Sequence, residues 1–280
     1  MHFSSGVNRP PYEAEDGYLQ VTSGCSHGRC EFCTFYKDAP FRVSPMEEVE
    51  ADIKELAASG WRFRRIFLQG ADPFILPFDS LMRIAGLIHH HLPFVESIGG
   101  YARVDNVWNK SADQLRELKR AGYGNFYFGN ESGDDFILER MNKGYKAETM
   151  VEMLGRLDEA GMPYIMNFLG GLGGRGYGLS HARKSADVIN RLNPTMVYAS
   201  ELTLFPDTPL LRDVAEGRFV EATEAERLED ELIGETIPAD PDVRNFSYTV
   251  IDGEVYYREN SRMHRMELPA VTTERVLGMI

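Results

Sequence analysis

The chain has 280 residues, 43% of them hydrophobic, which is enough to bury the core of a single α/β barrel with a short appendage. Its formal net charge of −13 argues against proteins that follow nucleic-acid phosphates or anionic membranes, and favours a small-molecule or peptide substrate. No apolar run approaches the length of a bilayer span, and residues 1–16 lack the pattern of a leader peptide. We therefore expect a cytoplasmic protein.

The predicted elements alternate between strands and helices along most of the chain. Residues 1–16 show no regular pattern and are expected to form a loose arm. Short apolar runs predict strands at 18–21, 66–68, 96–101, 125–129, 164–169 and 196–204. Start and stop signals, with Ser44 as the first N-cap, predict helices at 44–58, 79–91, 111–121, 134–141, 147–160, 180–192 and 223–235.

This alternation implies a parallel sheet with right-handed crossovers. Either a partial barrel or a doubly wound sheet fits the pattern, and both bind ligands at the carboxyl ends of their strands. The periodicity changes after Pro238, and the segment 248–257 is typical of a β-hairpin around Asp252-Gly253. We expect residues 237–280 to form a small C-terminal cap.

All three cysteines of the chain lie in the sequence Cys25-Ser-His-Gly-Arg-Cys30-Glu-Phe-Cys33. An odd number of closely spaced thiols is a poor disulfide framework, and it is more typical of a metal site. Three thiolates on a loop can hold three irons of a [4Fe–4S] cubane and leave the fourth iron open. Zinc is the alternative, with His27 or a distant histidine as a fourth ligand.

Residues 17–236 resemble the radical S-adenosylmethionine (radical SAM) superfamily, in its Elongator/coproporphyrinogen-dehydrogenase-like branch. The resemblance rests on the cysteine motif, on Gln69-Gly-Ala-Asp-Pro73, and on the stretch from Gly129 to Gly144. Four residues separate the first two cysteines, where the superfamily most often has three. The fold that the resemblance implies is a partial (β/α)6 TIM-type barrel at 17–236, flanked by the arm and the cap.

The resemblance also implies the chemistry. A [4Fe–4S] cluster binds SAM and cleaves it reductively, normally to a 5′-deoxyadenosyl radical, or in a variant with transfer of the aminocarboxypropyl group. The implied partners are a small-molecule or peptide substrate and a low-potential electron donor such as flavodoxin or ferredoxin. Nucleic acid and membrane are not expected as partners.

Individual positions acquire expected roles from the same resemblance. Cys25, Cys30 and Cys33 are expected to bind the cluster. The positions expected to contact SAM are Phe32, Gly70, Ala71, Asp72, Glu131, Ser132, Lys143, Asn167 and Gly171. Among these, Lys143 is expected to face the SAM carboxylate, and Asn167 the ribose. Tyr101, Arg103 and Glu201 lie at or just after strand ends and are candidates for contact with the substrate, and so for catalysis.

Two further hypotheses come from other classes of protein. The chain could be a zinc-stabilised binding protein without catalysis, which an iron and sulfide analysis would distinguish. The loop from Gly171 to Gly176 matches G-x-G-x-x-G, so a dinucleotide-dependent oxidoreductase is the third hypothesis. That loop lies late in the chain and lacks the acidic residue of the fingerprint, and we interpret it as a close approach to SAM. The histidines at 89–91 are expected to end a helix rather than bind a metal.

Overall fold

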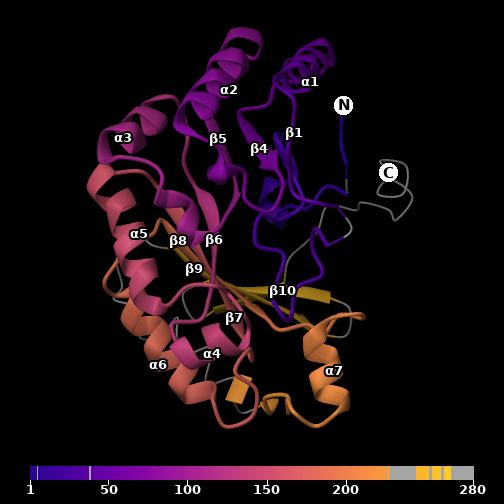
Figure 1. Cartoon of the computed structure of the whole chain (residues 1–280), viewed down its shortest axis with the longest axis vertical. Helices are drawn as coiled ribbons and strands as arrows, with labels where there is room; N and C mark the ends of the chain where they lie inside the picture. The colour runs from indigo at the N-terminus through magenta and orange to yellow at the C-terminus, as the bar shows by residue number, and fades with distance from the viewer. Residues whose placement is uncertain are drawn as a thin grey trace.

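A nine-stranded sheet forms the centre of the protein (Figure 1). The computed structural model describes residues 1–227 except 5, 38 and 225, together with the backbone of three later strands at 244–251, 254–259 and 262–265. In sheet order the strands are β1 (Gly17–Gln20), β4 (Arg65–Gln69), β5 (Ser97–Ala102), β6 (Phe126–Glu131), β7 (Tyr164–Gly170), β8 (Met196–Glu201), β9 (Arg244–Ile251), β10 (Glu254–Glu259) and β11 (Arg262–Arg265). In this order, each strand from β1 to β9 runs parallel to its neighbour. The predicted α/β fold with a partial barrel is confirmed: the six predicted parallel strands correspond to β1 and β4–β8, and β9 adds a seventh.

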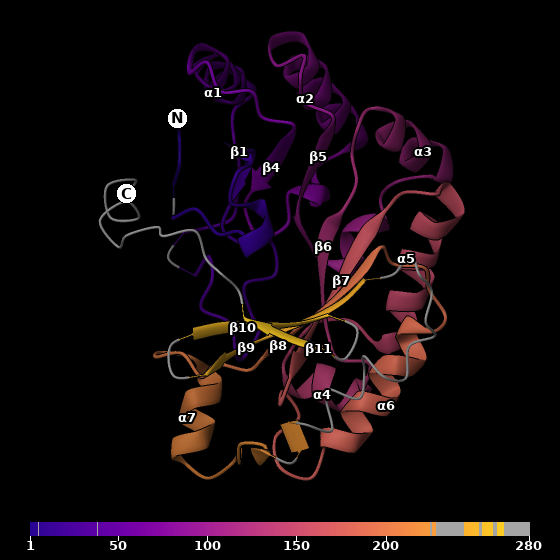
Figure 2. The same ribbon diagram turned by 180° about the vertical axis from the view of Figure 1, so that it is seen from behind.

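Helices form an arc around the outer face of this curved sheet, and both views show it (Figures 1 and 2). They are α1 (Met46–Ala58), α2 (Phe78–His91), α3 (Ala112–Arg120), α5 (Ala147–Ala160) and α6 (Gly178–Ile189). The shorter helices α4 (Asp135–Arg140) and α7 (Pro209–Ala215) contribute to a second apolar cluster, and α7 stands apart from the arc. Short 3₁₀ turns are η1 (Pro11–Glu13), η2 (Pro73–Ile75) and η3 (Val104–Val107). No helix among the described residues is long and apolar enough to cross a bilayer.

The local sequence explains most helix ends. Ser111 caps α3 through its side chain, which accepts a hydrogen bond from the Gln114 amide, and Gly161 ends α5 in the left-handed conformation. The predicted cap of α1 is wrong, because the N-cap is Pro45. Ser44 instead donates its amide to the Val21 carbonyl and prolongs the pairing of β2 with β3. Helix α7 was not predicted, and the predicted helix at 223–235 falls mostly outside the described residues.

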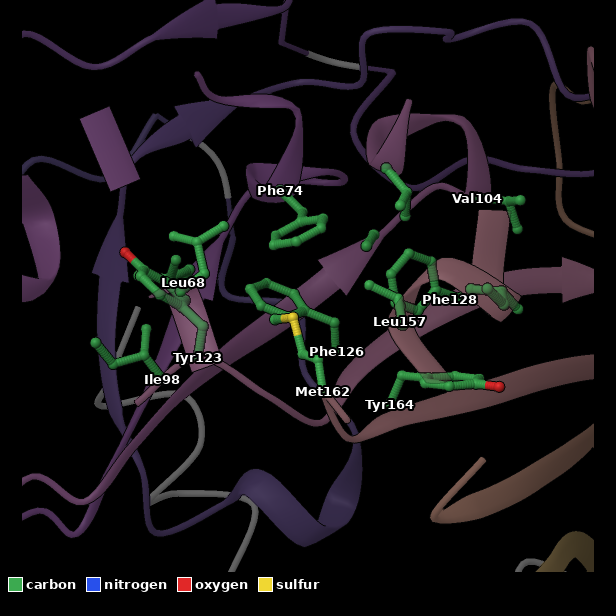
Figure 3. Close-up of a cluster of buried hydrophobic side chains, with 14 of the residues drawn as sticks. Leu68, Phe74, Ile98, Val104, Tyr123, Phe126, Phe128, Leu157, Met162 and Tyr164 are labelled. Atoms are coloured by element: carbon green, nitrogen blue, oxygen red, sulfur yellow. The ribbon is translucent and has the colours of Figure 1, made fainter. Parts of the chain in front are cut away.

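The main core lies between the sheet and its helices, where Phe74 packs on Phe126 with ring centroids 4.7 Å apart (Figure 3). Alternation along β6 points Phe126 and Phe128 outward to this core and Tyr127 inward. Inside the barrel, Tyr127 packs with Phe67 in a smaller cluster. Side chains that point inward from the strands therefore line the interior of the barrel.

The arm at 1–16 is not loose, which corrects the prediction. The Ser4 amide donates to the side chain of Gln20 at 2.8 Å, and the Asn8 amide donates to that of Gln69 at 3.1 Å. Further along, the Arg65 guanidinium donates to the Glu13 carboxylate at 2.8 Å. The arm is therefore fixed near both ends of β4. These contacts are polar and irregular, so no periodicity in the sequence announces them.

The C-terminal strands continue the barrel sheet. β9 pairs in parallel with β8, and β10 pairs antiparallel with β9, with Tyr248 opposite Tyr257. The predicted hairpin coincides with the β9–β10 pair. These strands are therefore part of the same sheet, and the small C-terminal cap expected at 237–280 stays a prediction.

Candidate active site

The loop that carries the three cysteines is closed at its base by a short antiparallel pair, β2 (Thr22–Ser23) with β3 (Arg42–Val43). Gly24 enters the loop at a φ of +66°, and a Cβ there would lie 2.6 Å from the Ala39 carbonyl oxygen. Only glycine fits this turn without strain. The Gly24 carbonyl also accepts the Ala71 amide at 3.1 Å, which joins the loop to the turn after β4.

The far side of the loop lies on the turn between α4 and α5. The Glu31 amide donates to the Met141 carbonyl at 3.1 Å, and the Asn142 side chain donates to the Arg29 carbonyl at 3.0 Å. His27 Nε2 lies 2.5 Å from the Asn142 carbonyl oxygen. The loop is thus held between β4 and the turn that carries Lys143.

The three thiols are free, partly buried, and open onto one cavity. Burial raises the pKa of Cys25 and, with the neighbouring Cys30, raises that of Cys33 to about 11. In the part of the chain that is described, no three His, Cys, Asp or Glu side chains gather closely enough for one metal ion. The three thiols thus share the wall of one cavity, as the protein ligands of a single cluster would.

A buried ion pair stands in the same cavity. Lys143 Nζ lies 3.2 Å from Glu131 Oε1, and their side chains are 5% and 10% exposed. Burial lowers the pKa of Lys143, but Tyr145 and the Glu131 carboxylate outweigh it, so the net pKa is raised and the ammonium stays charged. A Cβ at position 129 would lie 2.7 Å from the Glu131 carboxylate, so Gly129 leaves the room that this side chain occupies.

The backbone at Glu131 is strained and supported from behind. Its φ is +65°, in the left-handed region that a non-glycine residue seldom adopts, and the β6–β7 register shifts there. The Glu131 carbonyl oxygen lies 3.1 Å from Nε2 of the fully buried His181. Such strain persists only where surrounding contacts hold it, and it is common at functional sites.

Arg103 joins the ends of β5 and α4. Its guanidinium donates to the Asp105 carboxylate at 2.9 Å and to the Lys143 carbonyl at 2.9 Å. The Arg103 side chain is 7% exposed, and its charge is paired with Asp105, whose side chain is 43% exposed. Arg103 therefore fixes the position of Lys143 from the neighbouring strand.

Most of the predicted site residues line this single cavity, which encloses about 460 Å³ at the carboxyl ends of the strands. They are Cys25, Phe32, Cys30, Cys33, Ala71, Tyr101, Arg103, Glu131, Lys143, Asn167 and Glu201. The side-chain oxygen of Asn167 is buried and has no hydrogen-bond partner among the described atoms, so it remains available to a ligand. Residues distant in the sequence thus converge, as the parallel topology predicts.

Four predicted residues lie outside the cavity lining. Asp72 is fully buried, its pKa is raised by burial, and it accepts hydrogen bonds from the amide and hydroxyl of Ser26. Ser132 accepts the Asp134 amide at 2.9 Å. Gly70 packs on Thr22, and Gly171 approaches Ala222 and Arg227. In the structure, these residues shape or anchor the turns beside the cavity.

The sequence did not single out several residues of the cavity wall. They are Asn8, Arg9, Pro10, Pro11, Phe35, Tyr36, Ala102, Tyr127, Gly129, Leu169, Tyr198, Ser200, Leu202 and Phe205. Alternation along the strands could have identified Tyr127 and Tyr198 as inward-facing. No pattern in the sequence indicated that the arm at 1–16 forms part of the cavity wall.

The sequence model of the radical SAM superfamily matches residues 19–189, a segment that contains the cysteine loop, Glu131 and Lys143. This chain belongs to the radical SAM superfamily. Enzymes of this superfamily use a [4Fe–4S] cluster and SAM, and act on their substrates with the help of a reductant. The predicted family and cofactors are thereby confirmed.

Individual relatives are distant. The chain is 25% identical to the heme chaperone HemW of Bacillus subtilis over 202 residues, covering 70% of this chain and 52% of HemW. It is 24% identical over 172 residues to tRNA-2-methylthio-N(6)-dimethylallyladenosine synthase of Alkalilimnicola ehrlichii, covering 59% of this chain and 38% of the synthase. The chain therefore spans about half or less of the length of these curated relatives.

Solved structures show the same fold. The radical SAM enzyme coproporphyrinogen III oxidase (HemN) from Escherichia coli superposes with a TM-score of 0.56 and 12% identity, over 88% of this chain and 66% of HemN. Together with the match to HemW, this similarity supports the predicted Elongator/coproporphyrinogen-dehydrogenase-like branch.

Proposed function

We propose that this radical SAM enzyme reductively cleaves SAM at a [4Fe–4S] cluster held by Cys25, Cys30 and Cys33, and so starts radical chemistry on a small molecule or peptide. The observation that carries the proposal is that all three thiols and the Glu131–Lys143 pair open onto the same cavity. The chain has no other cysteine that could hold a second cluster.

The donor set fits the cofactors. Three thiols, with no fourth cysteine in the chain, suit a cubane with one open iron, and the unpartnered Asn167 oxygen can accept a hydrogen bond from a hydroxyl group of SAM. When bound, the reduced cluster supplies the electron that breaks a C–S bond of SAM. The remaining work belongs to the protein, which must bind, orient and shield the reactants.

The residues around the cavity divide this work. Lys143 presents a permanent positive charge, which can hold the SAM carboxylate while Glu131 restrains its direction. Phe32 offers an aromatic face beside the cysteines on the same loop. Arg103 holds the Lys143 backbone, and His181 holds that of Glu131, so both charged side chains start from fixed positions.

A direct test is the iron and acid-labile sulfide content of anaerobically reconstituted protein, which should reach about four of each per chain. Cys30→Ser should lose most of this iron and the visible absorption, because two thiolates hold the cubane poorly. Arg29→Gln, an exposed substitution in the same loop, is the matched control and should keep both. A Cys30→Ser variant with a full cluster would disprove the assigned ligand set.

The second readout identifies the reaction. Reduced protein incubated with SAM should release 5′-deoxyadenosine, measured by mass spectrometry. Release of 5′-methylthioadenosine instead would indicate cleavage on the other side of the sulfonium and transfer of the aminocarboxypropyl group. A protein that holds zinc and no sulfide would contradict the proposal altogether.

A further inference from the structure

One wall of the cavity comes from the N-terminal arm, which lies on the side where the arc of helices is open (Figure 2). Asn8, Arg9, Pro10 and Pro11 line the cavity together with the cysteines. The arm is fixed on both sides of Arg9, because the Asn8 amide donates to Gln69 and Glu13 pairs with Arg65. The backbone at Arg9 therefore has a defined place beside the cavity, and its side chain is exposed.

Arg9 differs from the other charged residues of the cavity wall. Within the described residues, Glu131 pairs with Lys143 at 3.2 Å, Arg103 with Asp105 at 2.9 Å, and Glu201 with Arg227 at 3.3 Å. Arg9 has no carboxylate within 4.0 Å in this part of the chain, and its guanidinium bonds only the Pro10 carbonyl, at 3.4 Å. Among the described residues, Arg9 is thus the cation of the cavity wall that has no carboxylate within 4.0 Å; its side chain is exposed, and the charge of Asp16 acts on it from a longer distance.

The surface beside Arg9 is aromatic. Tyr101 and Tyr127 face the cavity with ring centroids 6.0 Å apart, and Tyr101 packs edge-on against Phe67 at 5.3 Å. Tyr198 lines the same wall. Burial raises the pKa of all three phenols, so they remain neutral, and Tyr127 shares a hydrogen bond with the Glu13 carboxylate of the arm. These walls suit a flat or apolar body more than a charged chain.

We propose that the arm recognises the substrate, which carries a carboxylate or phosphate that pairs with Arg9 and an apolar or unsaturated body that lies against Tyr101, Tyr127 and Tyr198. A guanidinium presents a planar pair of donors that matches either anion. The inference rests on the proposed function only in placing the substrate in this cavity. It specifies the substrate as an organic anion.

The test uses probes of one shape and different charge, titrated into the anaerobically reconstituted full chain in the presence of SAM. Benzoate, phenyl phosphate, neutral benzamide and cationic benzamidine are compared by ligand-detected NMR. We expect at least one anion to bind about tenfold more tightly than benzamide, and benzamidine to bind least. Binding by benzoate alone identifies a carboxylate site, and binding by phenyl phosphate alone identifies a phosphate site.

Three variants locate the effect. Arg9→Gln should weaken binding of the anion by about tenfold, and Arg9→Lys should weaken it less, because the charge stays while the planar pair of donors is lost. Arg116→Gln, on the outer surface of α3 and paired only with Asp113, is the matched control and should bind as the unmodified chain does. Equal affinity for benzoate and benzamide, or unchanged anion binding in Arg9→Gln, would overturn the inference.

Loss of SAM affinity in Arg9→Gln with no change in anion binding would also overturn it, because Arg9 would then belong to the cofactor site. Failure of the proposed function appears elsewhere, in the iron, sulfide and 5′-deoxyadenosine measurements. An Arg9-dependent anion site in a protein without a cluster would leave this inference standing and remove the proposed reaction.

Discussion

The buried pair of Glu131 and Lys143 gives a sharp prediction of stability. Lys143→Met removes the ammonium that lies 3.2 Å from Glu131 Oε1. The Glu131 carboxylate then has no opposite charge beside it, in a site where its side chain is only 10% exposed. Breaking a buried pair on one side destabilises a protein by about 3–5 kcal/mol, because the remaining charge is uncompensated. We therefore expect a loss of that order in the free energy of unfolding of the cluster-free protein.

The double variant separates charge from packing. Glu131→Gln combined with Lys143→Met has no buried charge at this site, so it should be about 2 kcal/mol more stable than the sum of the two single losses. Lys54→Met is the matched control, since Lys54 pairs with Glu50 at 2.7 Å on the surface with its side chain 56% exposed. Its loss should stay below about 1 kcal/mol.

Urea unfolding followed by circular dichroism, under anaerobic and reducing conditions, measures these differences. Unfolding of Lys143→Met at the same urea concentration as the unmodified chain, or simple addition of the two single losses in the double variant, would show that no uncompensated charge is buried at this site. SAM affinity is a separate readout. Loss of a charge-assisted contact to the SAM carboxylate should weaken binding by about 1.5–3 kcal/mol in Lys143→Met, measured by calorimetry with the cluster in place.

Three further substitutions test the arm, a turn and a helix cap. Burial, with a hydrogen bond that the protonated Asp16 carboxyl donates to the Glu13 carboxylate, raises the pKa of Asp16 from its ordinary 3.8 to about 8, so the folded state keeps a proton that the unfolded chain releases. Stability should therefore fall as the pH rises from about 4 to about 8. In thermal melts, Asp16→Asn should reduce this dependence of stability on pH. An unchanged dependence would contradict the raised pKa of Asp16. Gly70→Ala should destabilise by more than about 2 kcal/mol, because φ is +115° and the added Cβ would lie 2.8 Å from the Thr22 carbonyl oxygen. Gly60→Ala has positive φ but open space and should lose only about 1 kcal/mol, so equal losses would refute the argument from the clash. Ser111→Ala should lower the free energy of unfolding by about 1 kcal/mol through its lost cap, whereas no change in urea midpoint would show that the cap is dispensable.

Much of the fold could be predicted because its parallel strands are short, apolar and followed by amphipathic helices. Helix α5 begins and ends where its signals indicate, with Gly161 at the end. The first helix cap was predicted incorrectly at Ser44 because the pairing of β2 with β3 takes up its backbone. Local signals cannot reveal this competition, since it depends on a partner strand about 20 residues earlier.

Site residues could be predicted from the sequence where a short motif contains them, and could not where contacts between distant segments place them. The close spacing of the three cysteines, all within nine residues, predicts a metal site. Glu131 and Lys143 were predicted from the motif between Gly129 and Gly144. Asp72 belongs to the same kind of motif, yet its side chain is buried against Ser26 and does not line the cavity. The position of Arg9 is set by contacts of its neighbours with Gln69 and Arg65, which lie more than 50 residues away in the sequence. Long-range polar contacts of this kind leave no periodic trace.

The order of strands in the main sheet has a consequence for how the protein is made. Among the described strands, each member of this sheet pairs with the next member along the chain, from β1 through β11. In a closed barrel the first strand is fully paired only after the last strand has been made. In this sheet each new strand pairs with the strand made just before it. The sheet can therefore grow during translation by adding one strand at a time as the chain leaves the ribosome. Its contacts stay short in sequence, so the entropy lost at each addition is that of one crossover connection.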